Sequence, residues 1–574
     1  MPHALREYAV VADGERGALI GPDGDLVWMC FPYWDSPAVF SGLVGGRGRY
    51  DARPVDEWRV WGGYYEPRSM IWRSRWVNSD GIVECREALA RPARRDRLVV
   101  LRRFQAIDRP ARVTAHLDIR SAFDRRAMSD LRLDDGIWAG RSGDIHLRWV
   151  GAADAVAGDG LELILDLEAG QAHDLVLELS LEPGREPLDP RDLWAATESD
   201  WHRRVPSCSD TLAPVDAELA YAVLTGLTSE CGGMAAAITT ALPERMEGDR
   251  NYDYRYSWIR DQCYAGEAVA THGGRLDLLD TAVRFVAERV LADEDELHAA
   301  YTVAGDPAPT RERSIDLPGY PGSPVVVGND ATGRFQLDAV GEALHLFAHA
   351  ARLDRLPSDA AKAARVAASV IGRRWQQPDA GIWETQQELW THSRLACVAG
   401  LRYAADAIAT PAEVSDWRGL AEHILSETTR TSLNSAGHWQ RAPDDPRVDA
   451  ALLIPAVRGA LAADDPRTVA TLAAVREELV DEGFVYRYHV GDQPLGDAEG
   501  AFMLCGFLLA LAEHQQGDLA TARGRFERIR SGCSTTGLFT EEYDVRQRQL
   551  RANLPQAFVH ALMLETATRL AHDA

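Results

Sequence analysis

Three features are scarce in this chain of 574 residues, and each shortage excludes a class of protein. Basic residues are few: 62 Lys and Arg stand against 87 Asp and Glu, and a net charge of −25 repels phosphate backbones and anionic membranes. Long apolar runs are missing, and the first residues lack the basic and apolar blocks of a signal peptide. We therefore expect a cytoplasmic protein that binds neither nucleic acid nor membrane and acts on a small neutral molecule.

Closely spaced cysteine pairs are also missing. The eight cysteines are scattered along the chain without a CxxC pair, at Cys30, Cys85, Cys208, Cys231, Cys263, Cys397, Cys505 and Cys533. Isolated cysteines favour reduced, buried thiols over a disulfide or zinc framework. We expect no structural metal.

The hydrophobic pattern changes near residues 206–215. Before this point short segments alternate between apolar and polar residues, which is typical of half-buried strands, at 97–107, 111–120, 143–151, 161–170 and 173–184. After Asp216, the expected cap of the first helix, apolar residues recur at three and four, as in 275–291, 337–353, 358–375, 393–409 and 501–516. The pattern predicts an antiparallel β-sandwich over 1–190, a helical linker over 191–214 and a helical domain over 215–574.

The helical domain is long enough to form a closed barrel. About a dozen helices of ordinary length fit its roughly 360 residues, which allows six helical hairpins arranged as an (α/α)6 barrel. An open helical solenoid also fits this number, but the sequence has no repeated signature of the kind that arrays show. In a barrel, we expect functional residues on the loops at one rim.

Two acidic clusters in the second half of the chain suggest a glycosidase. They are Trp383-Glu384-Thr385 and Thr540-Glu541-Glu542-Tyr543-Asp544, and each lies beside aromatic residues. Cleavage of a glycosidic bond requires one carboxyl group to protonate the leaving oxygen and a second to activate water or attack. Most Glu side chains are solvated surface groups, so either cluster alone would more often be structural.

Other loops carry candidate sugar-binding residues. In the aromatic-rich segment 251–264, Arg260 and Asp261 suit hydrogen bonds to adjacent hydroxyls, although the same pair also fits a helix start. Gly328 and Asn329 are common turn residues. His392 is interpreted as a polar support, because no second His lies at ligand spacing. Arg487 and Glu499 fit either a sugar site or a structural ion pair.

Five motifs in the same order resemble glycoside hydrolase family 15, which contains glucoamylases, glucodextranases, isomaltose glucohydrolases and bacterial α,α-trehalases. They are YDYRYSWIRD, GNDATGRFQLD, GIWE, YRYHVGDQPLGDAEGAF and GLFTEEYDVRQRQLRANLPQAF. The segment GALIGPDGDLVWMCFPYWDSPAVF also resembles the start of the bacterial members, so the resemblance covers nearly the whole chain. It implies a β-sandwich followed by an (α/α)6 barrel, and release of glucose from a non-reducing end with inversion of the anomer.

The resemblance also implies roles for single residues. Glu384 matches the general acid and Glu541 the general base. The remaining matches are sugar-binding or supporting residues, with Tyr254, Trp258 and Trp383 as aromatic walls, Arg260 and Asp261 on the glucosyl unit, Arg487 on the sugar and Glu542 as a support. An inverting mechanism places the two catalytic carboxyl groups about 6.5–9.5 Å apart, and a retaining one about 5–5.5 Å. This chemistry needs no cofactor.

The segment after the acid departs from the bacterial trehalase-like pattern. This chain has WETQQELWTHSRL where those members have WEVRG, a Gly-rich loop and HSK. Trp390 in this segment is expected to restrict the leaving-group site to a short ligand, with isomaltose-type α-1,6 glucosides favoured over trehalose and α-1,4 substrates. A disaccharide phosphorylase would not need Glu541, and a non-catalytic sugar-binding protein would be expected to lose one carboxylate. Nothing in the sequence indicates the oligomeric state.

Overall fold

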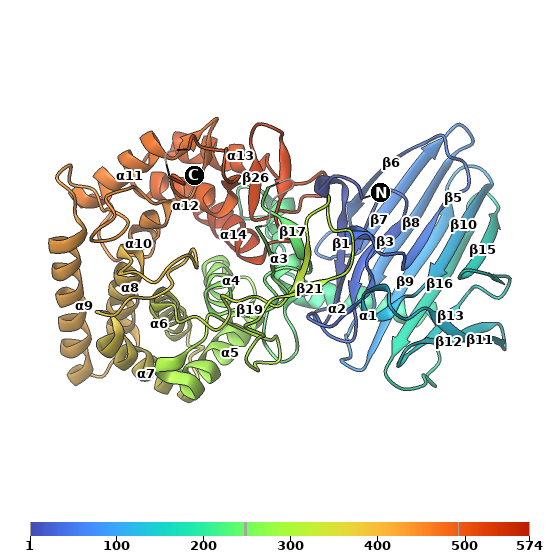
Figure 1. The fold of residues 1–574 in the computed structure, drawn as a ribbon, viewed down its shortest axis with the longest axis horizontal. Coiled ribbons are helices and arrows are strands. Elements are labelled where there is room, and N and C mark those ends of the chain that lie inside the picture. Colours follow the sequence, from blue (N-terminus) through green and yellow to red (C-terminus); the bar gives the residue numbers. More distant parts are fainter. Residues whose placement is uncertain (1, 246–249, 492, 573–574) are drawn as a thin grey trace.

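The N-terminal third of the protein is a sandwich of two antiparallel sheets (Figure 1). The computed structural model describes residues 2–245, 250–491 and 493–572. The first sheet contains β1 (Ala9–Ala12), β2 (Gly17–Ile20), β3 (Asp25–Cys30), β5 (Arg49–Pro54), β10 (Ala111–Asp118), β15 (Leu161–Leu167) and β14 (Val156–Ala157) in this spatial order, with β4 (Ala38–Phe40) beside β3. The second contains β11 (Met128–Asp134), β12 (Ile137–Ser142), β13 (Ile145–Val150), β16 (Ala172–Ser180), β9 (Arg97–Ala106), β8 (Ile82–Leu89), β7 (Trp72–Asn78) and β6 (Arg59–Tyr65). The predicted sandwich is confirmed.

The alternation of apolar residues explains how each strand is placed. In β15 the sequence LELILDL buries every Leu on one face and exposes the residues between them, because successive side chains point to opposite sides of a sheet. The inner faces of the two sheets bury Trp72, Trp76 and Trp149 in one core. A helix, α2 (Pro190–Arg204), follows the sandwich and begins at Asp189, whose side chain caps it by accepting from the Arg191 amide.

The helical part is a closed double ring. Six helices form the inner ring: α4 (Ile259–His272), α6 (Leu337–Arg352), α8 (Thr391–Ala407), α10 (Ile454–Val457), α12 (Met503–Gln515) and α14 (Ala557–His572). Six cover them: α3 (Pro214–Leu227), α5 (Asp277–Asp293), α7 (Ser358–Arg374), α9 (Pro411–Ser432), α11 (Pro466–Glu478) and α13 (Leu519–Arg530). Each inner helix packs on the next, and α14 packs on both α12 and α4. This contact closes the ring, so the predicted (α/α)6 barrel is confirmed and the solenoid is excluded.

One predicted helix start is wrong. The first barrel helix, α3, begins at Pro214 with Ala213 as its N-cap, and Asp216 lies in the first turn. Proline suits the first helical position because its fixed φ is already helical and its missing N–H needs no partner there. The carboxylate of Asp216 instead pairs with Arg530 of α13 at 2.5 Å.

The sandwich and the barrel share buried contacts. Trp28 of β3 donates its indole N–H to the carbonyl of Ile238, which precedes a short strand of the barrel, β17 (Thr240–Pro243). Arg255, between the barrel strands β18 (Asn251–Asp253) and β19 (Ser257–Trp258), donates to the carbonyl of Ser36 at 2.9 Å. The sandwich therefore supports the barrel segment that carries the first aromatic motif.

All eight cysteines are unpaired, and six of them are buried. Over the described parts of the chain, no helix has both the length and the apolar character that a membrane crossing requires.

Candidate active site

A deep pocket of about 570 Å³ lies at one end of the barrel. Its volume falls within the range of roughly 300–1,000 Å³ that is common for small-ligand sites. The N-terminal ends of the inner helices and the loops before them supply its walls. The lining includes Glu244, Arg250, Tyr252, Tyr254, Trp258, Arg260, Asp261, Asn329, Arg334, Trp383, Glu384, Arg487, Tyr488, Glu541, Gln556 and Phe558. Eight of the ten residues predicted for the site therefore line one cavity.

The loop that carries Glu384 is anchored at Asp379. The Asp379 carboxylate accepts from the amides of Leu337 and Gly381 and from the hydroxyl of Ser393, which ties the loop to α6 and α8. Gly381 has a φ of +62°, and a Cβ there would lie 2.5 Å from the Trp390 ring. Glu384 itself has a φ of +54°, a left-handed conformation that is uncommon for a residue with a side chain. Strained backbone of this kind is often found at functional sites.

Three side chains fix the carboxyl group of Glu384. Its Oε1 accepts from the indole N–H of Trp258 at 2.7 Å and from the amide of Gln336 at 2.8 Å. The guanidinium of Arg260 lies 3.7 Å from the same oxygen. Arg334 holds the backbone of the loop, because it donates to the Glu384 carbonyl at 2.7 Å. The carboxyl group is thus positioned while 18% of the side chain stays exposed.

Arg260 and Asp261 lie in the first turn of α4, at the floor of the pocket. Arg260 donates to Gln336 and to the carbonyl of Ile382, both at 3.2 Å. Its Nε lies 3.7 Å from Oδ2 of Asp261, and neither atom makes a hydrogen bond to a described residue. Burial raises the pKa of Asp261 to about 6, against the opposing charge of Arg260. Both side chains line the pocket, so a ligand there would lie beside this buried Arg-Asp pair.

Glu541 lies on another wall of the pocket, directly before the short strand β26 (Glu542–Asp544). Tyr254 donates its hydroxyl to Oε2 of Glu541 at 2.8 Å. Burial and the nearby Glu244 raise the pKa of Glu541 to about 8, although Arg487 opposes this shift. The Glu541 carboxyl group is therefore more basic than an ordinary carboxylate, which suits a group that accepts a proton.

We use the name wall cluster for Glu244, Glu541 and Glu542. One carboxylate oxygen of each lies within 4.8 Å of the other two. Two guanidinium groups border the wall cluster: Arg250 pairs with Glu244 at 2.9 Å, and Arg487 lies 3.9 Å from Glu244. Arg487 also pairs with Glu499 at 2.5 Å, so the predicted ion pair is present, and the same side chain lines the pocket.

Trp383 forms part of the wall and is fixed from behind. Its indole N–H lies 2.8 Å from one oxygen of Asp449 and 3.0 Å from the other. Asp449 is held in turn by Arg441 at 3.0 Å. The guanidinium of Arg487 lies 5.5 Å from the centre of the Trp383 ring. The flat face of this ring is therefore fixed in position, as a pyranose-stacking wall requires.

Two residues predicted to contact substrate lie outside the pocket. Trp390 is buried behind the acid loop, where it donates to the Asp379 carbonyl at 3.0 Å, and it does not line the pocket. Glu542 is fully buried and accepts from the Gly500 amide at 2.7 Å. His392 is buried beside Trp390 in a small cavity, and burial lowers its pKa to about 3.

Several pocket residues were not predicted. Glu244 directly follows β17 and belongs to neither of the two acidic clusters that the sequence indicated. Arg334 belongs to the segment GNDATGRFQLD, for which the sequence indicated only a turn at Gly328 and Asn329 and a helix start near Gln336 and Asp338. Gln336 itself does not line the pocket but holds the carboxyl group of Glu384. In the sequence, Arg334 and Gln336 stand directly before an amphipathic helix, and this pattern is the signal that could have indicated them.

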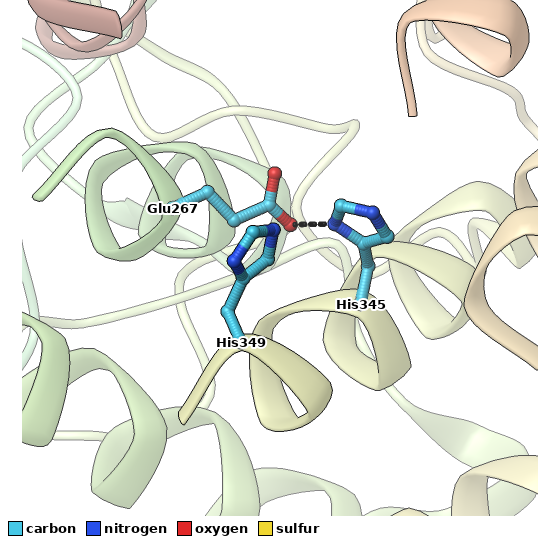
Figure 2. Close-up of side chains that lie close together, drawn as sticks. All are labelled: Glu267, His345 and His349. Atoms are coloured by element: carbon cyan, nitrogen blue, oxygen red, sulfur yellow. Dashed lines mark hydrogen bonds and ion pairs between the residues drawn. The ribbon is translucent and has the colours of Figure 1, made fainter. Parts of the chain in front are cut away.

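A second polar group lies deeper between the inner helices (Figure 2). Glu267 of α4 faces His345 and His349 of α6, and His345 Nδ1 lies 2.9 Å from Glu267 Oε1. The spacing of two His residues by four on one helix resembles a metal site. Arg458, however, pairs with the other oxygen of Glu267 at 3.1 Å and with Glu565 of α14 at 2.7 Å. We call these five residues the axial cluster, and Arg458 joins its two Glu residues in an ion-pair network.

Two carboxyl groups that face one sugar-sized pocket, with aromatic walls and a buried Arg-Asp pair, define a glycoside hydrolase. The comparison with protein families narrows the class. Residues 222–568 match the model described as glycosyl hydrolases family 15, and the chain belongs to this family. Residues 2–188 match the model of the trehalase-like N-terminal domain. The resemblance noted in the sequence is confirmed, and the protein is an α-glucoside hydrolase.

Curated relatives match along almost the whole chain. A trehalase of Mycolicibacterium smegmatis is 29% identical over 612 residues, which cover 99% of this chain and 91% of that protein. A trehalase of Thermoplasma acidophilum is 25% identical, with 96% and 98% covered. Among solved structures, a bacterial glucoamylase complexed with acarbose superimposes with a TM-score of 0.70 at 13% identity, and covers all of this chain and 95% of its own. The structural match shows a shared fold.

Proposed function

We propose that the protein is an α,α-trehalase that hydrolyses trehalose with inversion at one anomeric carbon. The similarity to curated trehalases over 99% of the chain, including the N-terminal domain, is the observation that carries the choice of substrate. The α-1,6 preference expected from the sequence depended on Trp390 at the leaving-group site. Because Trp390 lies behind the acid loop, that argument no longer favours isomaltose.

The proposed mechanism assigns one task to each wall of the pocket. Arg260 and Asp261, which line the pocket, hold the glucosyl unit at its floor. Glu384 protonates the bridging oxygen, and Glu541 removes a proton from the water that attacks the anomeric carbon from the other face. Tyr254 and Trp258 orient these two carboxyl groups through the hydrogen bonds already described. The products are one β-glucose and one α-glucose.

A substrate panel with NMR detection tests this proposal. Trehalose, isomaltose, maltose, nigerose and kojibiose are compared, and the anomers are recorded before mutarotation. Trehalose should give the highest kcat/KM and equal initial amounts of β- and α-glucose. Initial release of α-glucose alone would show a retaining mechanism. A higher kcat/KM for isomaltose than for trehalose would show that the preferred substrate is an α-1,6 glucoside. A requirement for phosphate with formation of glucose 1-phosphate would replace hydrolysis by phosphorolysis.

A further inference from the structure

A second cavity of about 290 Å³ lies behind the wall cluster. Glu244 lines both this cavity and the catalytic pocket. Glu499 and Gly500 also line the second cavity, and its outer side includes the exposed side chains of Arg546 and Gln547. Glu244 is therefore a partition between the place where water is activated and a separate polar space that reaches the protein surface.

The charges around Glu244 do not balance when every group is ionised. Four carboxyl groups, Glu244, Glu499, Glu541 and Glu542, meet two guanidinium groups, Arg250 and Arg487, which leaves an excess of two negative charges. Among the described residues, Tyr252 and Tyr254 also lie near these carboxyl groups, and both are neutral at physiological pH because burial raises their pKa values. Asp261 adds a further negative charge near Glu541. Other charged or titratable residues line the second cavity with Glu244: Arg245, Tyr486, Asp497, Asp544, Arg546 and Arg551. Burial raises the pKa of Glu244 and of Glu542 as well. Protons must therefore be shared among these carboxyl groups.

Neighbouring carboxyl groups connect Glu541 with the second cavity, and a proton could move along them. The nearest oxygens of Glu541, Glu542 and Glu244 all lie within 4.8 Å of one another. A substrate that fills the catalytic pocket covers Glu541 from that side, so the proton that Glu541 takes from water needs another exit. The second cavity borders Glu244 at that point.

We propose that Glu244 is a positioning residue that receives the catalytic proton from Glu541 and passes it to the second cavity. This inference rests on the proposed function, in which Glu541 is the base. Water gives one proton to Glu541 as its oxygen bonds to the anomeric carbon, and the glycosidic bond breaks while Glu384 protonates the leaving oxygen. The proton on Glu541 then moves to Glu244, directly or through Glu542, and on to solvent. Glu384 takes a proton back from solvent after the products leave, so no proton is gained or lost.

The test compares Glu244→Gln with Asp497→Asn. Asp497 lines the same second cavity but pairs with Arg546 at its outer side, so it controls for the loss of one carboxylate there. Glu244→Gln should lower kcat about tenfold or more and change KM less than threefold. It should also move the acidic limb of the kcat/KM profile to lower pH, because Glu541 loses a negative neighbour that raises its pKa. Asp497→Asn should change neither.

A structural role would lower activity and thermal stability together without moving the acidic limb. Glu244→Asp keeps a carboxyl group and should give a kcat between those of wild type and Glu244→Gln, which keeps the test decisive if the Gln variant does not fold. An unchanged kcat and an unmoved limb in both variants would overturn the relay. If Glu541→Gln also kept full activity, the assignment of the base would fail instead, so the two failures can be told apart.

Discussion

Among the described residues of the barrel, the wall cluster and the axial cluster both contain buried carboxyl groups, and the two clusters differ in how this charge is balanced. In the wall cluster carboxyl groups outnumber guanidiniums, and the pKa of Glu541 is raised to about 8. In the axial cluster burial also opposes ionisation, but Arg458 and Arg569 outweigh it and lower the pKa of Glu565 to about 2.

This difference separates carboxyl groups that exchange protons from carboxyl groups that stay ionised. A raised pKa near neutral pH is what a group needs to take up and release protons during turnover. A strongly lowered pKa keeps Glu565 charged under all ordinary conditions and available to hold α14 to the rest of the inner ring through Arg458. The same scaffold therefore uses one residue type for chemistry at its rim and for cohesion along its axis.

The largest expected effect is on activity at the rim. Glu384→Gln and Glu541→Gln should each lower kcat for trehalose by about 10²–10⁴, the usual contribution of general acid–base catalysis. Circular dichroism and thermal unfolding should show intact folding, since Gln keeps the size of Glu. Glu267→Gln in the axial cluster is the matched control, and it should keep most of the activity at low temperature. Full activity in either rim variant would contradict the assignment.

The next effect is on stability along the axis. Arg458→Met leaves Glu267 and Glu565 buried without their partner, which should lower the free energy of unfolding by about 3–5 kcal/mol. Chemical denaturation measures this value.

Arg569→Met is the control for Arg458→Met. Arg569 also pairs with Glu565, at 3.1 Å, but its side chain is 23% exposed. Its loss should cost at most about 1 kcal/mol, as for other partly exposed pairs. Equal losses in the two variants would show that Arg458 is not the central partner.

The third prediction concerns pH. The pKa of Glu541 is raised in the folded protein to about 8, from the ordinary value of 4.5, so its stabilising contribution is complete below the ordinary value and is lost as pH rises through 8. Glu541→Gln removes this loss. The variant should therefore be more stable than wild type at pH 9 by roughly 1–4 kcal/mol, with no gain at pH 4, since one pKa unit corresponds to about 1.4 kcal/mol. Thermal unfolding at both pH values tests this, and an equal shift at the two would contradict it.

The smallest effect is expected at Trp390. Trp390→Phe removes the hydrogen bond to the Asp379 carbonyl and should cost about 1 kcal/mol of stability. The ratio of kcat/KM values for trehalose and isomaltose should stay unchanged, because the ring does not border the pocket. Arg334→Ala, which frees the acid loop at the pocket wall, is the comparison variant and should lower kcat. If Trp390→Phe changed the ratio of kcat/KM values for trehalose and isomaltose, Trp390 would have to be assigned to the leaving-group site.

Local periodicity made most of the fold predictable. The alternation in β15 and the three-and-four spacing in α7 each indicate which face of the element is buried, and each pattern can be recognised within a short stretch of sequence. Ring closure was not visible in the same way, because the contact of α14 with α4 joins distant segments. The exact start of α3 was missed because an acidic residue in the first turn resembles a cap.

The site was predicted where a motif carried its own chemistry. Glu384, Arg260 and Asp261 stand in aromatic-rich motifs, and the structure brings them to one pocket. The place of Glu244 in the site could not be predicted from its own motif, because it depends on the contact between the end of β17 and the segment that contains Glu541. Trp390 was misplaced for the opposite reason: its position after the acid suggested nearness to substrate, whereas the turn at Gly381 directs the chain so that the ring packs behind the loop.

The contact between Arg255 and the carbonyl of Ser36 has a consequence for how the molecule is made. The sandwich leaves the ribosome first and can fold before the barrel is synthesised. When the segment around Tyr254 and Trp258 is synthesised, the folded sandwich can already provide the surface on which this segment packs. A barrel produced alone would lack this template, and the two aromatic residues would lose the support that sets their hydrogen bonds to Glu541 and Glu384. The N-terminal third thus supplies the surface against which the barrel segment with Tyr254 and Trp258 folds.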